Sequence, residues 1–161
     1  AWDAVIAAAI EVRDRLTTLG LTCFVKTSGG KGLHVVTPLT PGSGWEETKA
    51  FTKKVAESMA ADSPDLYVAV TTKSKRRGKI LIDYLRNGRG ATAVAPYSTR
   101  ARAGAPVSMP LAWDELNDGI GPAYFTVANT PSRLASLAAD PWAEFRKAAE
   151  PLPPDGRRRG A

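Results

Sequence analysis

The fold of this chain is decided by the stretch Lys26-Thr-Ser-Gly-Gly-Lys-Gly-Leu-His34, which lies between two short runs of apolar and β-branched residues. The runs at 21–27 and 33–38 predict two strands, because β-branched and aromatic side chains favour extended backbone. The polar, glycine-rich residues between them are typical of a tight turn. We therefore expect a β-hairpin with the glycine-rich loop at its tip.

Two longer segments beside this hairpin have helical spacing. Apolar residues recur every three or four positions at 2–19, which ends before Gly20, and again at 45–60, where Ser43 could cap the first turn. Further strands are expected at 67–70, 79–84 and 91–95, and helices with proline in the first turn at 131–138 and 141–149. Together these elements predict an α+β fold.

The length and composition are those of one ordinary globular domain. A chain of 161 residues with 43% hydrophobic and 24% charged residues can bury a sizeable core. No run approaches the ~20 apolar residues that cross a bilayer. Cys23 is the only cysteine, so neither an intrachain disulfide nor a cysteine zinc cluster can form. Because no signal peptide opens the chain, we expect a cytoplasmic protein.

The last residues differ in composition from the rest. The segment 151–161 combines proline, glycine and consecutive arginines, which favours a linker or a disordered tail over packed structure. We therefore expect one domain at 1–150 and a linker or tail at 151–161.

Positive charge is concentrated in one segment. The chain has 22 Lys and Arg against 16 Asp and Glu, and residues 71–102 hold nine of these basic residues with a single acid, Asp83. A run such as 73–77 is often only a solvated face. The four arginines beyond it flank apolar and turn residues, where they favour a polyanionic partner such as phosphate. These four are Arg86, Arg89, Arg100 and Arg102.

The glycine-rich loop has the parts of an anion site. Glycines let backbone N–H groups turn toward an anion and allow its close approach. Ser28 adds a hydroxyl, Lys31 adds a point charge, and His34 adds a ring N–H that can donate to a phosphate oxygen. The spacing is neither that of a P-loop nor that of a dinucleotide-binding motif. The loop predicts a triphosphate cradle, and a plain hairpin with a satisfied histidine is the alternative.

Asp83 is the second candidate for chemistry, because it directly follows the apolar run Ile80-Leu-Ile82. A buried carboxylate without a partner is costly, so Asp83 requires a cation or a capping role in a nearby turn. A divalent metal ion is one candidate cation. A salt bridge to Arg86 is the structural alternative.

These segments together resemble the polymerase domain of bacterial LigD, the primase-polymerase module of multifunctional DNA end-joining ligases. The resemblance rests on the segment from Lys26 to Val35 and on two later runs. Arg100 and Arg102 follow the second of these runs in the sequence. The runs are Ile82-Asp-Tyr-Leu-Arg-Asn87 and Arg89-Gly-Ala-Thr-Ala-Val-Ala-Pro-Tyr-Ser98. The resemblance continues through Pro106-Val-Ser-Met-Pro-Leu-Ala-Trp-Asp-Glu-Leu116 to about Phe145, and so covers most of the chain.

The resemblance implies a primase-polymerase fold of the archaeo-eukaryotic primase superfamily, with an RRM-like catalytic sheet flanked by helices. It implies a DNA repair nucleotidyltransferase that adds nucleotides, preferring ribonucleotides, to primer 3′ ends in non-homologous end joining, with manganese or magnesium as cofactor. The implied partners are DNA ends or gapped duplex, nucleoside triphosphates, ligase and phosphoesterase domains of the same chain, and the Ku end-binding protein. The implied location is the nucleoid-associated cytoplasm of a bacterium.

The resemblance also assigns roles to single residues. Ser28 and His34 resemble the family's triphosphate-binding pair, with His34 also catalytic, and Lys31 belongs to the same loop. Asp83 resembles a catalytic metal-binding carboxylate. The remaining implied contacts are Arg86 with the nucleotide, and Arg100 and Arg102 with the triphosphate or nucleic acid.

The family's first motif, a D-x-D pair of acids just before the segment 2–19, does not occur in this sequence. Asp3 belongs to the predicted helix and does not have that spacing. We therefore expect the chain to be part of a longer protein, to lack the amino-terminal part of the fold, and to be weak or inactive alone.

Two other functions stay open at this point. One is a non-catalytic nucleic-acid binding module held to DNA through 73–102, for which Asp83→Ala would leave binding unchanged. The other is a docking half of a larger ligase, for which the Arg100→Ala and Arg102→Ala variants would lose a partner.

Overall fold

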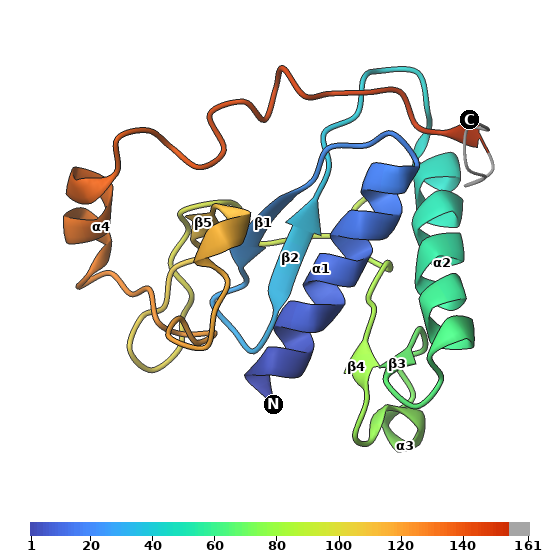
Figure 1. Ribbon diagram of the computed structural model, residues 1–161, viewed down its shortest axis with the longest axis horizontal. Coiled ribbons are helices and arrows are strands. Elements are labelled where there is room, and N and C mark those ends of the chain that lie inside the picture. The colour runs from blue at the N-terminus through green and yellow to red at the C-terminus, as the bar shows by residue number, and fades with distance from the viewer. Residues whose placement is uncertain (155–161) are drawn as a thin grey trace.

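The computed structural model of the chain describes residues 1–154 and contains the expected mixture of helices and strands. Helix α1 (Trp2–Thr18) stops before Gly20, whose φ of 89° suits a residue without a side chain. The hairpin follows, with β1 (Phe24–Thr27) and β2 (Leu33–Val36) paired antiparallel. Strand β5 (Pro110–Leu111) pairs antiparallel with the other edge of β1, which gives a three-stranded sheet in the order β2-β1-β5 (Figure 1).

The second long helix is α2 (Trp45–Asp62). Figure 1 shows α2 beside α1, on the side away from the larger sheet. Near one end of α2, β3 (Tyr67–Val68) and β4 (Ile80–Leu81) pair in parallel as a two-stranded sheet. The short helix α3 (Lys73–Arg76) lies in the connection between these two strands. The α+β class predicted from the sequence is therefore confirmed.

Three apolar clusters hold these layers together. The first joins the end of α1 to α2, the second lies under β1 and β5, and the third joins α1 to α2 and β3. Their buried members are Leu16, Leu19, Leu21, Cys23 and Phe51; Val25, Val107, Met109, Leu111 and Phe125; and Ala8, Met59 and Tyr67. Burial raises the pKa of the Cys23 thiol to about 12, so Cys23 acts as a packed apolar filler.

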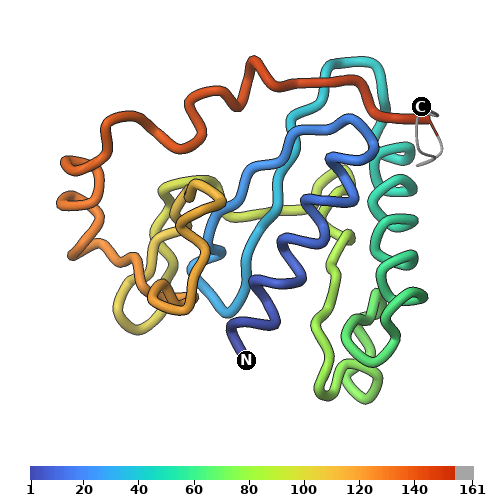
Figure 2. Tube along the Cα trace, viewed as in Figure 1, coloured from blue at the N-terminus to red at the C-terminus, as the bar shows by residue number. Residues whose placement is uncertain are grey.

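The chain after helix α4 (Thr130–Ser136) returns along one edge of the molecule to the side of α2 (Figure 2). The Thr40 N–H donates to the Glu150 carbonyl at 3.0 Å, which ties this return to the loop after β2. Leu152 then packs against the first apolar cluster. The part of the expected tail from residue 155 onward lies outside the described residues.

Some sequence predictions were wrong in detail. The strands are shorter than expected, and helix α2 begins after Gly44 with no side-chain cap, so Ser43 does not cap it. The segment 91–95 is not a strand, because its carbonyl groups accept hydrogen bonds from side chains. The segment 141–149 forms successive turns in place of a helix, and its aromatic rings pack on Phe24. The elements that the sequence patterns missed are α3, β5 and the 3-10 helix η1 (Trp113–Glu115).

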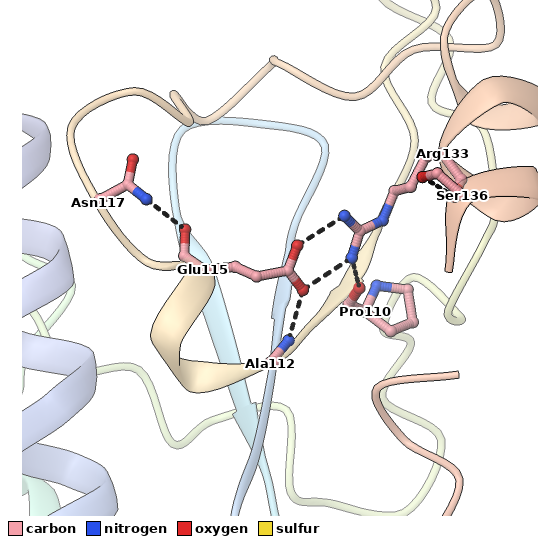
Figure 3. A network of polar contacts seen from close by, with 6 residues as sticks. All are labelled: Pro110, Ala112, Glu115, Asn117, Arg133 and Ser136. Carbon is pink, nitrogen blue, oxygen red and sulfur yellow. Dashed lines mark hydrogen bonds and ion pairs between the residues drawn. The ribbon is translucent and has the colours of Figure 1, made fainter. Parts of the chain in front are cut away.

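A partly buried ion pair joins α4 to η1, and the same arginine donates a hydrogen bond to β5 (Figure 3). The Arg133 guanidinium donates to both oxygens of Glu115, at 2.7 and 2.9 Å, and to the Pro110 carbonyl at 3.1 Å. Glu115 also accepts the Ala112 N–H at 2.9 Å. The hydrogen bond from Arg133 lowers the pKa of Glu115, against the opposing effect of burial. The pair therefore fixes η1 and α4 to the larger sheet.

We expect the Glu115→Gln substitution to lower the free energy of unfolding by about 3 kcal/mol near neutral pH, because it leaves Arg133 half-satisfied in a site where that side chain is only 10% exposed. The folded pKa of Glu115 lies below its unfolded value. Its contribution is therefore complete above the unfolded pKa of roughly 4.3 and is lost as the pH falls through the folded pKa. Urea unfolding of both proteins at neutral and acidic pH measures the difference.

The control is Glu144→Gln, whose carboxylate pairs with Lys147 at 3.7 Å and is 70% exposed. An exposed pair of this kind contributes at most about 1 kcal/mol, so this variant should unfold close to the wild type. Equal losses in the two variants would show that the pair of Arg133 and Glu115 does not hold the sheet and α4 together.

Candidate functional site

The hairpin places two candidate side chains opposite each other. In its register Lys26 of β1 pairs with His34 of β2, and Thr27 pairs with Leu33. Directly opposite residues on antiparallel strands project from the same face of a sheet. The Lys26 and His34 side chains therefore share one face, just below the glycine-rich loop.

The loop folds around the Ser28 side chain. Its hydroxyl oxygen accepts the N–H of Gly30 at 3.1 Å and the N–H of Gly32 at 3.3 Å, while the Ser28 N–H donates to the Gly32 carbonyl at 3.0 Å. The Ser28 hydroxyl thus occupies two of the loop N–H groups that the sequence pattern offered to an anion. Lys31 lies exposed at the tip of the loop.

Two arginines lie on the glycines of this loop. Arg100 donates from Nη1 to the Ser28 carbonyl at 2.8 Å, and a Cβ atom on Gly29 would lie only 2.6 Å from the Arg100 Cγ. Gly29 also has a positive φ of 69°. A Cβ atom on Gly30 would lie 3.3 Å from the Arg102 Nη1. Gly29 and Gly30 therefore leave room for the Arg100 and Arg102 side chains to lie against the loop.

The face that carries His34 opens into a pocket of about 410 Å³. Its cationic lining comes from Arg86 and Arg100, and the remaining wall is formed by the backbone and small side chains of 92–94. Arg86 donates from Nη1 to the Thr92 carbonyl at 2.7 Å, which ties that wall to the turn after β4. The structure thus brings three of the sequence-predicted site residues, His34, Arg86 and Arg100, into one pocket.

His34 is neutral in this pocket. Burial, together with the charges of Lys26, Arg100 and Arg86, lowers the pKa of His34 to about 4, against an opposing effect of Asp83. A neutral imidazole carries one N–H donor and one acceptor nitrogen. His34 can therefore donate to a phosphate oxygen without a charge of its own, while its cationic neighbours supply the attraction.

Asp83 lies exposed in the turn after β4. One of its carboxylate oxygens accepts the Leu85 N–H at 2.9 Å, so Asp83 caps this turn. The Arg86 guanidinium donates to the Thr92 carbonyl instead. The ion pairs of residues 1–154 include none between Arg86 and Asp83, so the alternative of a salt bridge between them is not formed. The same described residues contain no group of three or more His, Cys, Asp or Glu side chains able to hold a metal ion.

Lys26 was missed as a site residue. Its side chain is only 3% exposed, and its ammonium donates to the Val94 carbonyl at 2.7 Å and to the Ser108 hydroxyl at 2.6 Å. Burial, and then the charge of Arg100, lower its pKa to about 8. The available signal in the sequence was a lysine inside the apolar run Phe24-Val-Lys-Thr27, directly before the loop.

A second hollow, of about 450 Å³, lies beside the aromatic rings of Trp142 and Phe145 and extends to Tyr97 and Pro110. Trp142 donates from its ring nitrogen to the Val25 carbonyl at 3.0 Å, so this region packs on β1. It includes none of the sequence-predicted site residues. The charged pocket at His34 is therefore the better candidate for chemistry.

The helices of residues 1–154 include none that is long and apolar enough to span a membrane. In sequence, the chain is 43% identical over 145 residues to the multifunctional non-homologous end joining protein LigD of Pseudomonas aeruginosa, which covers 89% of this chain and 17% of that protein. It is 35% identical over 130 residues to the bifunctional non-homologous end joining protein LigD of Bacillus subtilis, which covers 80% of this chain and 21% of that protein. The chain thus spans about a fifth of these relatives.

In structure, the chain matches the polymerase domain of Mycobacterium tuberculosis Ligase D in complex with DNA. The TM-score is 0.78 at 35% sequence identity, over 92% of this chain and 50% of that one. The model of the LigD primase-polymerase domain family matches residues 1–142. The resemblance read from the loop and the arginine segment is thereby confirmed, and the chain belongs to the LigD primase-polymerase domain family.

Proposed function

We propose that the complete gene product is a DNA repair nucleotidyltransferase that adds nucleotides, preferably ribonucleotides, to primer 3′ ends during non-homologous end joining. The observation that carries this proposal is the cationic pocket at the glycine-rich loop, in a chain of the LigD primase-polymerase family. Residues 1–150 form part of the polymerase domain in this proposal. Because Leu152 packs on the core, the linker to any further domain begins after it.

The pocket suits a nucleoside triphosphate. In the proposed reaction the primer 3′ oxygen bonds to the α-phosphorus, the bond to the β-phosphate oxygen breaks, and pyrophosphate leaves. Such transfer depends on positioning and on stabilisation of the phosphate charge more than on covalent chemistry by the protein. Arg86 and Arg100 face that charge, and neutral His34 donates a hydrogen bond. Ser28 and Lys31 hold the loop side of the triphosphate.

A divalent metal ion, manganese or magnesium, belongs to this proposal as well. The carboxylate predicted from the sequence, Asp83, is exposed and acts on His34 electrostatically, and a single exposed carboxylate does not make a metal centre. We assign Asp83 as one ligand only. Its turn is fixed by the Leu85 N–H and by the Arg86 bond to Thr92, which would hold the carboxylate in a constant place.

The proposed DNA contact is the basic segment around α3. Residues 71–79 are exposed throughout, and they hold five basic residues and no acid. A surface of this kind attracts the phosphate backbone regardless of base sequence. Arg102, which lies over Gly30, adds a separate cation at the nucleotide loop. The solved relative in complex with DNA supports a nucleic-acid partner for the same fold.

The names of the relatives support a larger assembly. Both the P. aeruginosa and the B. subtilis proteins are called non-homologous end joining proteins with more than one function. We propose that ligase and phosphoesterase domains accompany this domain and that the Ku end-binding protein is a partner. The non-catalytic DNA-binding module is the competing function, and the Asp83 experiment below separates the two.

Extension of a gapped primer-template with manganese and ribonucleotides by the complete gene product tests the catalytic proposal. We expect Asp83→Asn to lower the extension rate by about a hundredfold or more, because it removes the proposed metal ligand. We expect His34→Ala to lower the rate by about tenfold to a hundredfold, because it removes a hydrogen-bond donor to the reacting phosphates. The control Asp118→Asn changes an exposed acid elsewhere and should extend normally. Unchanged DNA binding with no extension in the wild type would favour the non-catalytic module.

Substitution of the loop glycines tests whether they leave the room that Arg100 needs beside the loop. Gly29→Ala places a methyl group 2.6 Å from Arg100 and strains a positive φ, so we expect the affinity for nucleoside triphosphate to fall about tenfold as Arg100 moves. Gly32→Ala meets nothing within 4 Å and is the matched control. Isothermal titration of both variants measures the affinities. A larger loss in the Gly32 variant would contradict this role of Gly29.

The salt dependence of DNA binding tests the basic segment. We expect Arg76→Ala and Arg77→Ala each to reduce the slope of log affinity against log salt by about one, the value for one lost phosphate contact. Fluorescence anisotropy with a gapped duplex over a salt series provides the slope. The control Lys147→Ala removes an exposed cation that pairs with Glu144, and its slope should equal that of the wild type. Unchanged slopes in both arginine variants would remove this segment from the DNA contact.

A further inference from the structure

Lys26 is the only charged residue among those buried in the described part of the chain. Its ammonium makes two hydrogen bonds, one to the Val94 carbonyl and one to the Ser108 hydroxyl. Ser108 is fully buried, and its hydroxyl donates in turn to the Thr27 carbonyl at 2.7 Å. Both acceptors of Lys26 are neutral oxygens, so the positive charge is solvated but not neutralised.

The charges around Lys26 make its burial harder to explain by stability alone. The ion pairs of residues 1–154 do not include Lys26, and the charge that acts on it is that of the Arg100 guanidinium, which repels it and lowers its pKa. Burying an unpaired ion costs several kcal/mol, and an apolar side chain of similar length would avoid that cost. The position therefore holds a cation at the expense of stability, as expected where an anion binds.

The geometry puts this cation directly behind the pocket. Lys26 lies opposite His34 across the two strands, and the Val94 carbonyl that it holds belongs to a residue of the pocket wall. The same ammonium thus fixes one wall of the pocket and sits between that wall and the sheet. Arg86 holds the wall two residues earlier, at the Thr92 carbonyl.

We propose that Lys26 is a positioning residue for nucleotide binding, which anchors the 92–94 wall and supplies a buried positive charge that favours the triphosphate over nucleotides with fewer phosphates. This inference rests on the proposed function, because it assigns the pocket to a nucleoside triphosphate. It adds a specificity for phosphate number to that site. A purely structural lysine would hold the wall for every nucleotide equally.

The test compares the binding of UTP and UMP to the complete gene product with magnesium and without DNA, using isothermal titration. Uridine nucleotides avoid adenylate sites elsewhere in a longer chain. We expect Lys26→Met, which keeps the length and removes the charge, to weaken UTP binding about tenfold to a hundredfold and UMP binding much less. The control Lys53→Met removes an exposed cation on α2 that pairs with Glu57, and it should leave both affinities unchanged. Equal losses for UTP and UMP in Lys26→Met would overturn the proposal.

A measurement on the wild-type protein covers the case in which Lys26→Met does not fold. Arg100 is the charged group that acts on Lys26, and Arg86 and Asp83 act on His34, the cross-strand neighbour of Lys26. The pKa of Lys26 is about 8, whereas that of His34 is about 4. We therefore expect the preference for UTP over UMP to fall as the pH rises from about 7 to about 9, because the Lys26 ammonium loses its charge. A preference that stays constant over this range would overturn the proposal.

The same preparation separates this inference from the proposed function. Manganese-dependent primer extension by the wild type tests the function, and the ratio of UTP to UMP affinity tests Lys26. A wild type that extends primers while Lys26→Met keeps the full UTP preference would overturn the role of Lys26 alone. A wild type that prefers UTP in a Lys26-dependent way but never extends a primer would support Lys26 and contradict the polymerase.

Discussion

A buried ammonium without a counter-ion is the constraint on which the site depends. Lys26 reaches from β1 to the Val94 carbonyl and the Ser108 hydroxyl, and so joins the hairpin to two segments that lie far from it in sequence. Because an ion in a protein interior must be solvated by fixed dipoles, these segments cannot move independently of the strand. The place of the pocket wall therefore follows from the position of one charged group.

The glycine-rich loop meets a steric constraint of a different kind. Its glycines do not chiefly expose N–H groups, since Ser28 takes the N–H groups of Gly30 and Gly32 for itself. They leave space where two arginine side chains approach the backbone, and the distance of 2.6 Å between the Arg100 Cγ and a Cβ on Gly29 shows how little room there is. Apart from the exposed Lys31, the positive charge at the loop thus comes from residues some seventy positions later in the chain.

Local patterns predicted the local structure and missed what depends on distant contacts. The hairpin and the two long helices follow from periodicity and turn chemistry within each segment, so they were predicted well. The segment 91–95 looked like a strand, but its carbonyl groups bond to Arg86 and Lys26, whose proximity no local pattern encodes. Lys26 was missed because a lysine in a strand is usually solvated, and its burial depends on Ser108. The shared pocket of His34, Arg86 and Arg100 was anticipated only through the family resemblance.

The pocket electrostatics explain why these residues belong together. Lys26, Arg86 and Arg100 each lower the pKa of His34, and Arg100 lowers that of Lys26, so the cations work against one another when no anion lies between them. Packing that only stabilised the fold would interleave acids with these groups, as it does with Glu115 beside Arg133. The pocket instead keeps its positive groups fixed by backbone carbonyls, which orient them without neutralising them. A polyanion entering the pocket relieves this repulsion and finds its contacts already in place, so little ordering cost remains to oppose binding.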